Sequence, residues 1–334
     1  MFNIFKKIIF LLVLTSIFIF SKSAFAYTFD TSKDEVYLGG ETVGLKLNTG
    51  VTVSKTFAIV DGQNLIKPWQ DADIRENDII ISYNAKKVET SDDLLTEIRK
   101  SGGSQVEIEV LRNEAVIKSK IKPVFKDESY TLGIYVKDNI IGIGTLTYVI
   151  PNSNIFGALG HQIDGAKNIG GLMYEATVTG IKKGSVGSAG SKKATINTKQ
   201  IGSIEKNTIT GIHGYYEGSK SERKLIKIGK KEEVKLGAAQ IVTCIDKKYI
   251  NYYDIEITSV TKQTTKDIKG IKFKVTDPKL LAETNGIIQG MSGSPIIQDG
   301  KLIGAVTHVL VNNPEEGFGI FIEFMFSDMG VYLK

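Results

Sequence analysis

The sequence predicts a mainly β protein with three parts: a short apolar N-terminal segment, a mixed α+β module and a long β-rich body. Glycine is abundant and proline scarce, at 34 and 6 of 334 residues. Short runs rich in Val, Ile and Thr recur along the chain, as they do in strands joined by tight turns. Helical periodicity is convincing only at residues 92–100 and, briefly, at 278–284. A chain of this length accommodates two domains.

Residues 1–26 predict export. Lys6 and Lys7 precede the apolar run 8–20, and Ala24-Phe25-Ala26 supplies an Ala-x-Ala end, which together make a secretory signal. The run of 13 residues is shorter than the roughly 20 that span a bilayer as a helix. An uncleaved membrane anchor is the alternative, and either form places the remaining chain outside the cytosol.

Residues 27–125 predict a compact α+β module. A glycine-rich apolar stretch at 39–47 opens it, and residues 51–53 read as a strand. Ser91 is the expected N-cap of a helix over residues 92–100, with acids in its first turn and bases in its last. Residues 106–110 alternate as a half-buried strand.

This order of a glycine-apolar loop, an Ala-x-Ile-x-x-x-Asp-x-Ile turn, a helix and a strand resembles a PDZ domain. Asn77 stands where PDZ domains usually carry glycine, and Asn tolerates a left-handed backbone. PDZ domains bind a chain terminus by adding it as a strand. The resemblance places the carboxylate-binding loop at Val43, Gly44, Leu45 and Lys46. A PDZ fold used only as a spacer or for internal packing is the alternative.

Residues 126–334 predict a β-rich body. Its strand-like runs are 132–137, 140–149, 174–181, 201–212, 225–228, 234–245, 253–260, 271–275, 301–309 and 317–324. So many strands over about 200 residues favour a barrel or a sandwich. A fold of two β-barrels would fit.

The segment 287–297 carries Ser292 between two glycines and two apolar runs. A serine hydroxyl needs a base to take its proton and donors to stabilise the oxyanion. Gly290 can bend the backbone so that its own N–H and that of Ser292 point at one spot, and Gly293 could let a substrate strand pass. The sequence Gly-x-Ser-Gly-Ser-Pro resembles the Gly-Asp-Ser-Gly-Gly-Pro signature of chymotrypsin-like peptidases. A plain turn is the alternative reading.

His161 is the best candidate for the base among the three histidines. It follows an apolar run and a glycine, so its imidazole can stay accessible at a strand end. His213 and His308 are the other two. The chain order His…Asp…Ser is that of chymotrypsin.

A carboxylate should orient the imidazole. Asp277 follows a strand and lies 15 residues before Ser292. Spacing alone does not separate it from its rivals Asp164, Asp246, Asp254 and Asp267.

Nearly the whole chain after the signal resembles the SpoIVB (stage IV sporulation protein B) peptidases, which combine a membrane segment, a PDZ domain and a serine-peptidase domain. The matching pieces are residues 44–49, 132–134, 142–147, 158–161, 273–277, 289–297 and 304–309. By this resemblance Ser292 is the nucleophile, His161 the general base and Asp277 its acidic partner. The fold it implies is a PDZ domain followed by a chymotrypsin-like double β-barrel.

The resemblance also implies a biological role. Family members enter the space around the developing spore, cleave themselves near the PDZ and N-terminal region, and cut a membrane-bound regulator of an intramembrane protease. That cut starts late sporulation transcription. A PDZ adaptor with an inactive peptidase body is the alternative. An envelope protease of the HtrA kind fits less well, because its PDZ domain follows the peptidase domain.

Two positions depart from the related patterns. Asp164 follows His161-Gln162-Ile163 directly, where the family usually has Ser or Thr before the Asp, so Asp164 receives no role here. Met291 stands where chymotrypsins activated from a zymogen carry Asp. We therefore expect no activation by a newly exposed amino terminus.

Composition predicts no cofactor, metal or nucleic-acid partner. Cys244 is the single cysteine and lies in an apolar run, and no Cys/His metal spacing exists. After residue 26 the chain holds 39 basic and 37 acidic residues. It has no basic stripe with interleaved aromatic residues.

Overall fold

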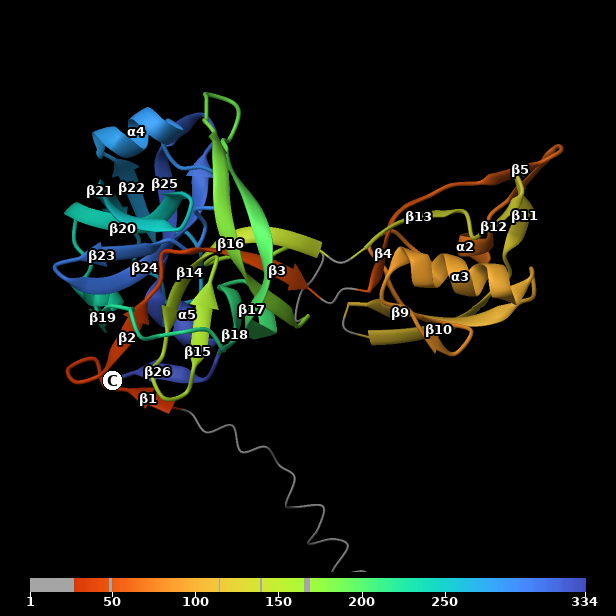
Figure 1. Cartoon of the computed structure of the whole chain (residues 1–334), viewed down its shortest axis with the longest axis horizontal. Coiled ribbons are helices and arrows are strands. Elements are labelled where there is room, and N and C mark those ends of the chain that lie inside the picture. The colour runs from red at the N-terminus through yellow and green to blue at the C-terminus, as the bar shows by residue number, and fades with distance from the viewer. Residues whose placement is uncertain (1–26, 48–49, 114, 139, 165–168) are drawn as a thin grey trace, which may run out of the picture.

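The computed structural model describes residues 27–47, 50–113, 115–138, 140–164 and 169–334. It has a β-rich body and a smaller α+β domain to one side of it (Figure 1). The prediction of a mainly β protein is confirmed. The predicted signal, residues 1–26, lies outside the described residues. Within the described ranges, no helix is long and apolar enough to cross a membrane.

The first half of the body is a closed ring of six antiparallel strands. The ring closes because β14 pairs with both β15 and β3. Alternate residues of β3, namely Val43, Leu45 and Leu47, are fully buried in one apolar cluster. The strands are β3 (Thr42–Leu47), β14 (Ile140–Val149), β15 (Ile155–Ala158), β16 (Gly171–Lys182), β17 (Ser191–Thr208) and β18 (Gly211–Tyr216).

The second half is another closed ring of six antiparallel strands, with its own apolar cluster. The strands are β20 (Gly237–Asp246), β21 (Tyr249–Val260), β22 (Ile271–Val275), β23 (Pro295–Gln298), β24 (Lys301–Leu310) and β25 (Asn313–Phe321). The predicted helix at 278–284 is confirmed as α4 (Pro278–Thr284), which lies between β22 and β23.

Short elements join the rings. β2 (Glu35–Leu38) pairs with β14 on one side and with β19 (Leu225–Ile228) on the other, and β19 runs parallel to β24. A 3-10 turn, Lys231–Glu233, follows β19. At the end of the chain, α5 (Ile322–Ser327) leads to β26 (Val331–Leu333), which pairs with β1 (Tyr27–Phe29).

The α+β domain is built on the sheet β10-β9-β7-β4-β13, and β8 pairs with β7. Its strands are β4 (Val51–Thr56), β7 (Ile79–Tyr83), β8 (Lys86–Lys87), β9 (Val106–Arg112), β10 (Ala115–Ile121) and β13 (Ile134–Lys137), with the hairpins β5 (Ile59–Asp61) to β6 (Asn64–Ile66) and β11 (Val124–Lys126) to β12 (Ser129–Thr131). Its helices are α2 (Pro68–Asp71) and α3 (Ser91–Ser101). Asn77 takes a left-handed φ of 70°, as its turn requires.

The predicted helix of the module is confirmed, with one correction at its start. Thr90, not Ser91, is the N-cap of α3. Its hydroxyl accepts from the Asp93 N–H, and the Asp93 carboxylate accepts from the Thr90 N–H. This reciprocal capping box satisfies two amides that would otherwise lack partners. Gly102 ends the helix in the left-handed conformation.

The structure corrects the expected boundaries of residues 27–125 and 126–334. The α+β domain is inserted between β3 and β14, two paired strands of the first ring. Strands β2 and β3 therefore belong to the body. Conversely, β13 was expected to begin the body but pairs with β4 of the inserted domain.

The peptide-binding loop predicted at Val43, Gly44, Leu45 and Lys46 is wrong for the same reason. These residues form β3, which pairs with β14 on one edge and β16 on the other. No free edge remains for a peptide. The sequence analysis chose the wrong stretch because residues 131–134, Thr-Leu-Gly-Ile, have the same glycine-apolar character and lead into the edge strand β13.

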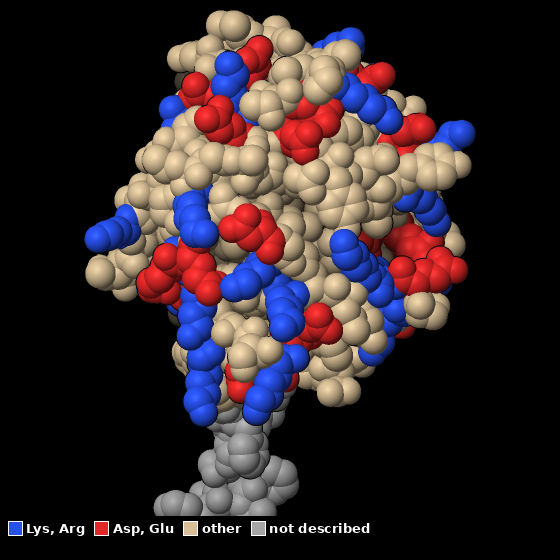
Figure 2. All heavy atoms as spheres, turned by 90° about the vertical axis from the view of Figure 1, so that its left-hand side faces the viewer, with Lys and Arg blue, Asp and Glu red and all other residues tan. Residues whose placement is uncertain are grey.

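One face of the body carries charges of both signs. Figure 2 shows Lys and Arg side chains interspersed with Asp and Glu side chains over that face. Exposed and half-buried pairs of this kind on the body include Lys272 with Glu316 and Lys301 with Glu233. Such pairs contribute little to stability individually, but they compensate charge locally.

We predict that Leu45→Ala destabilises the body rather than the inserted domain. Removing a fully buried leucine costs about 2–5 kcal/mol of unfolding free energy. Amide hydrogen exchange should therefore accelerate in β14 and β16, with β4 and β7 unchanged. Lys46→Ala, on the other face of the same strand, is the matched control. Faster exchange confined to β4 and β7 would contradict the placement of β3.

Candidate active site

Ser292 lies in a tight loop between α4 and β23. Gly290 and Gly293 have φ values of 92° and 91°, a region that glycine enters without steric cost. A Cβ on Gly293 would lie 2.1 Å from the Thr145 carbonyl oxygen and 2.4 Å from the Leu159 nitrogen. The space that the sequence argument gave to a substrate strand is therefore occupied by the backbone of the first ring.

Hydrogen bonds from both rings hold this loop. From β14, the Thr145 N–H donates to the Ser292 carbonyl at 2.9 Å and the Thr145 hydroxyl donates to the Gly290 carbonyl at 2.8 Å. From β24, the Val306 carbonyl accepts from the Gly293 N–H at 2.7 Å. The loop is thus fixed where the two rings meet.

Two amides of the loop are free to bind an anion. The N–H groups of Gly290 and Ser292 have no hydrogen-bond partner among the described residues. The Lys192 N–H donates to the Gln289 carbonyl at 2.9 Å, and in a trans peptide the following N–H points the opposite way. The Gly290 N–H is therefore directed away from Lys192. Two preset donors beside a hydroxyl are what oxyanion stabilisation requires.

A cleft of about 560 Å³ contains these groups. Its lining brings together Ser292, Gly290 and His161 from distant parts of the chain, along with the start of β14 at residues 140–143. In this conformation the Ser292 hydroxyl donates to the Thr307 carbonyl at 3.0 Å. No hydrogen bond joins this hydroxyl to an imidazole among the described residues, so proton transfer requires one of the two side chains to move.

His161 is held in the tautomer that suits a base. It follows β15 and is half-buried, and its Nδ1 lies 2.8 Å from the Gln162 carbonyl oxygen. A carbonyl can only accept, so Nδ1 carries the proton and Nε2 has a free lone pair. The Gln162 carbonyl thus fixes the tautomer of this imidazole, which is one of the two tasks of the carboxylate in a Ser-His-Asp triad.

His308 is a second histidine in the cleft, which the sequence analysis did not place there. Its ring centroid lies 5.0 Å from that of His161. Burial, helped by the nearby His161, lowers the pKa of His308 to about 4, so it is neutral at physiological pH. The register of the hairpin could have revealed this. Pro295 pairs with Ala305, Ser292 lies three residues before Pro295, and His308 lies three residues after Ala305.

Asp277 is not brought into the cleft. Its carboxylate caps α4 by accepting from the Leu280 N–H at 2.8 Å. Asp164, one of the rivals, is the carboxylate that lines the cleft among the described residues. Its negative charge acts to raise the pKa of His308, against the effect of burial.

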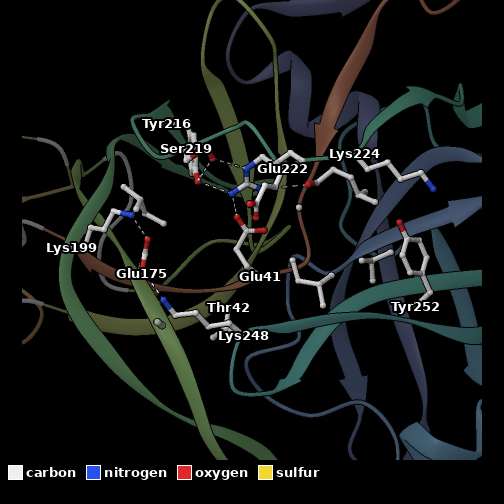
Figure 3. A pocket seen from close by; sticks show the side chains of 17 residues that line it. Glu41, Thr42, Glu175, Lys199, Tyr216, Ser219, Glu222, Lys224, Lys248 and Tyr252 are labelled. Carbon is white, nitrogen blue, oxygen red and sulfur yellow. Dashed lines mark hydrogen bonds and ion pairs between the residues drawn. The ribbon is translucent and has the colours of Figure 1, made fainter.

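A second hollow, of about 450 Å³, lies elsewhere on the body (Figure 3). Its charged groups are mostly paired with one another. Arg223 contacts Glu41, and Glu175 accepts from Lys199 at 2.6 Å and Lys248 at 2.9 Å. No histidine lines it. A serine hydroxyl, an imidazole and free amides therefore meet in the first cleft and not in this second hollow.

Two family models match this chain. The model described as SpoIVB peptidase S55 matches residues 128–326, and the PDZ domain model matches residues 36–122. Among solved structures, the active form of the Rv3671c protease from M. tuberculosis aligns at 15% identity, with 57% of this chain and 75% of that chain covered and a TM-score of 0.34. An inactive serine-to-alanine mutant of Rv3671c from M. tuberculosis H37Rv aligns at 15% identity, with 57% of this chain and 82% of that chain covered and a TM-score of 0.31.

We predict that Asp277→Asn labels with a fluorophosphonate at nearly the wild-type rate. Asn caps a helix about as well as Asp, so the variant keeps α4 and removes only the charge. Asp277→Ala should lose about 1 kcal/mol of unfolding free energy, the usual value of a cap. A rate loss near the roughly 10⁴-fold of an Asp→Asn change in a catalytic triad would contradict this and assign Asp277 to the catalytic centre.

Proposed function

This chain belongs to the SpoIVB peptidase S55 family and is a serine endopeptidase, and we propose that Ser292 is its nucleophile and His161 its general base. The observation that carries the proposal is the meeting, in one cleft, of a hydroxyl, an imidazole with a free Nε2 and two unpaired amides.

The proposed reaction follows the usual course of serine peptidases. Nε2 of His161 takes the Ser292 proton as the hydroxyl oxygen attacks the scissile carbonyl, and the amides of Gly290 and Ser292 stabilise the oxyanion. His161 then protonates the leaving amine. Water, activated by the same imidazole, releases the acyl group and regenerates the serine. Asp164 lines the same cleft as this imidazole.

The two rings fit the double β-barrel of chymotrypsin-like peptidases. Each ring is six antiparallel strands closed by its own pairings, and the cleft lies between them. Closed rings leave no edge strands, so the loops between strands are left to form the site. Family membership and this topology support the assignment together.

We propose that the inserted PDZ domain binds a chain terminus along β13. This strand pairs only with β4 among the described residues, so its other edge can accept an added strand. The turn before it, residues 131–133, would receive the carboxylate. Only two residues separate β13 from β14, whose residues 140–143 line the cleft. A bound terminus would therefore sit beside the connection to the catalytic centre.

We further propose the signalling role of the SpoIVB peptidases for this chain. It would be exported across the cytoplasmic membrane, tethered or released around the forespore, and would cleave itself and then a membrane-bound regulator of an intramembrane protease. Late sporulation transcription would follow. The family match and the export signal expected at residues 1–26 support this role.

We predict that Ser292→Ala abolishes both self-cleavage and fluorophosphonate labelling, because no other hydroxyl in the cleft has the two free amides beside it. His161→Ala should slow labelling by at least about 10³-fold, through loss of the base. The measurements are gel-based labelling and N-terminal sequencing of the mature chain. Processing of Ser292→Ala at the wild-type rate, in a host lacking related proteases, would reject Ser292 as the nucleophile. A folded wild-type chain without an adduct would favour the adaptor alternative.

We predict that a peptide with a free apolar C-terminus binds the inserted domain and that its amidated form does not. Ile134→Pro should weaken binding, since proline removes an N–H and disfavours the strand. Fluorescence anisotropy of the labelled peptide measures both. Ile117→Pro, on β10 at the opposite edge of the same sheet, is the matched control. Equal affinity for the amidated peptide would contradict carboxylate recognition.

A further inference from the structure

A lysine is buried beneath the serine loop without a carboxylate partner. Lys192 is only 6% exposed, and its amine contacts three hydroxyls, those of Thr42 at 3.2 Å, Thr145 at 3.3 Å and Thr243 at 3.0 Å. Among the described residues it forms no ion pair. Thr42 also lines the second hollow, where Figure 3 labels it. A buried amine without an opposite charge is costly, so its position calls for a functional explanation.

Lys192 contacts the loop at Gln289 and Gly290. Its backbone N–H holds the Gln289 carbonyl. Its side chain packs against Gly290, where a Cβ would come within 3.1 Å of the lysine Cβ and Cδ. Its amine meets the Thr145 hydroxyl, which donates in turn to the Gly290 carbonyl at 2.8 Å. Backbone and side chain thus fix the two peptide groups that flank Gly290.

The chemistry of the amine sets the direction of these bonds. An ammonium group has three donors and no acceptor, whereas a hydroxyl can donate one proton and accept others. Each threonine must therefore accept from Lys192. The Thr145 proton is left free to donate to the Gly290 carbonyl. A charged amine orders this hydroxyl chain without a carboxylate.

We propose that Lys192 is the positioning residue of the oxyanion site, acting through Thr145 on the peptide group of Gly290. This inference rests on the proposed function of Ser292, since Lys192 would position the loop that carries Ser292. Lys192 does not touch the reacting atoms. It would hold the loop in the form that leaves the Gly290 and Ser292 amides free for the oxyanion.

The test compares Lys192→Met with the wild type by fluorophosphonate labelling. Methionine keeps the backbone N–H and most of the side-chain length. The maximal labelling rate should fall by about tenfold or more, while the probe concentration giving half that rate stays constant, because only the step that forms the oxyanion is affected. Absence of an adduct on the folded wild-type chain would reject the proposed function itself. A labelled wild type with an unchanged Lys192→Met rate would reject only the role of Lys192.

Variants of the threonines that contact Lys192 test whether its effect on the labelling rate passes through Thr145. Thr145→Val should lose about as much rate as Lys192→Met, and the double variant no more than either alone, because both break one chain of contacts. Thr243→Val, which contacts the amine but not the loop, is the matched control and should lose much less. The proposal would be overturned if the rate losses of the two single variants multiplied in the double variant, or if Thr243→Val lost as much labelling rate as Thr145→Val. Thermal unfolding of each variant separates rate losses from loss of fold.

The pH dependence gives an independent readout. Burial lowers the pKa of Lys192 to about 7. The titratable neighbour is Cys244, whose pKa burial raises, so it stays a neutral thiol. The wild-type advantage over Lys192→Met should be greatest below pH 7 and shrink above it, as the amine loses its proton. A ratio that does not vary with pH would contradict an effect of the charged amine.

Discussion

The backbone contact between the serine loop and β14 is the constraint on which the proposed catalytic centre depends. Gly293 has no room for a single methyl group because the Thr145 carbonyl and the Leu159 amide occupy that space. The loop and β14 are close enough for Thr145 to form two hydrogen bonds with the loop, one through its backbone and one through its side chain. Because β14 belongs to one ring and the loop leads into the other, the same contact fixes the joint between the rings.

This contact also explains how a flexible sequence becomes a rigid site. Glycines at 290 and 293 allow conformations that other residues enter only with strain. The freedom they bring is removed by hydrogen bonds from β14, β17 and β24. Their unpaired amides are therefore preorganised, and preorganised dipoles need no rearrangement when negative charge develops. Catalytic geometry here is a property of the body as a whole.

Sequence patterns predicted the parts of this molecule better than their arrangement. The alternation of β-branched residues identified most strands of the body. Capping chemistry and periodicity located α3 to within a residue, and periodicity located α4. The glycine-serine segment predicted the loop and its free amides, because those depend on local backbone freedom. Domain boundaries were missed, since two similar glycine-apolar stretches compete for one role and only long-range pairing decides between them. The positions of His308 and Lys192 beside the serine loop were missed for a related reason, because strand register and burial place them there.

The insertion point has a consequence for how such a protein could have arisen. Leu47 and Ile140 are register partners on adjacent antiparallel strands, and the whole inserted domain occupies the connection between them. In a simpler relative of this fold a tight turn of two to five residues, the usual length of a hairpin connection, would join the same two ends. A recognition module could thus enter an existing enzyme by replacing one turn, without disturbing a single strand pairing of the ring that received it.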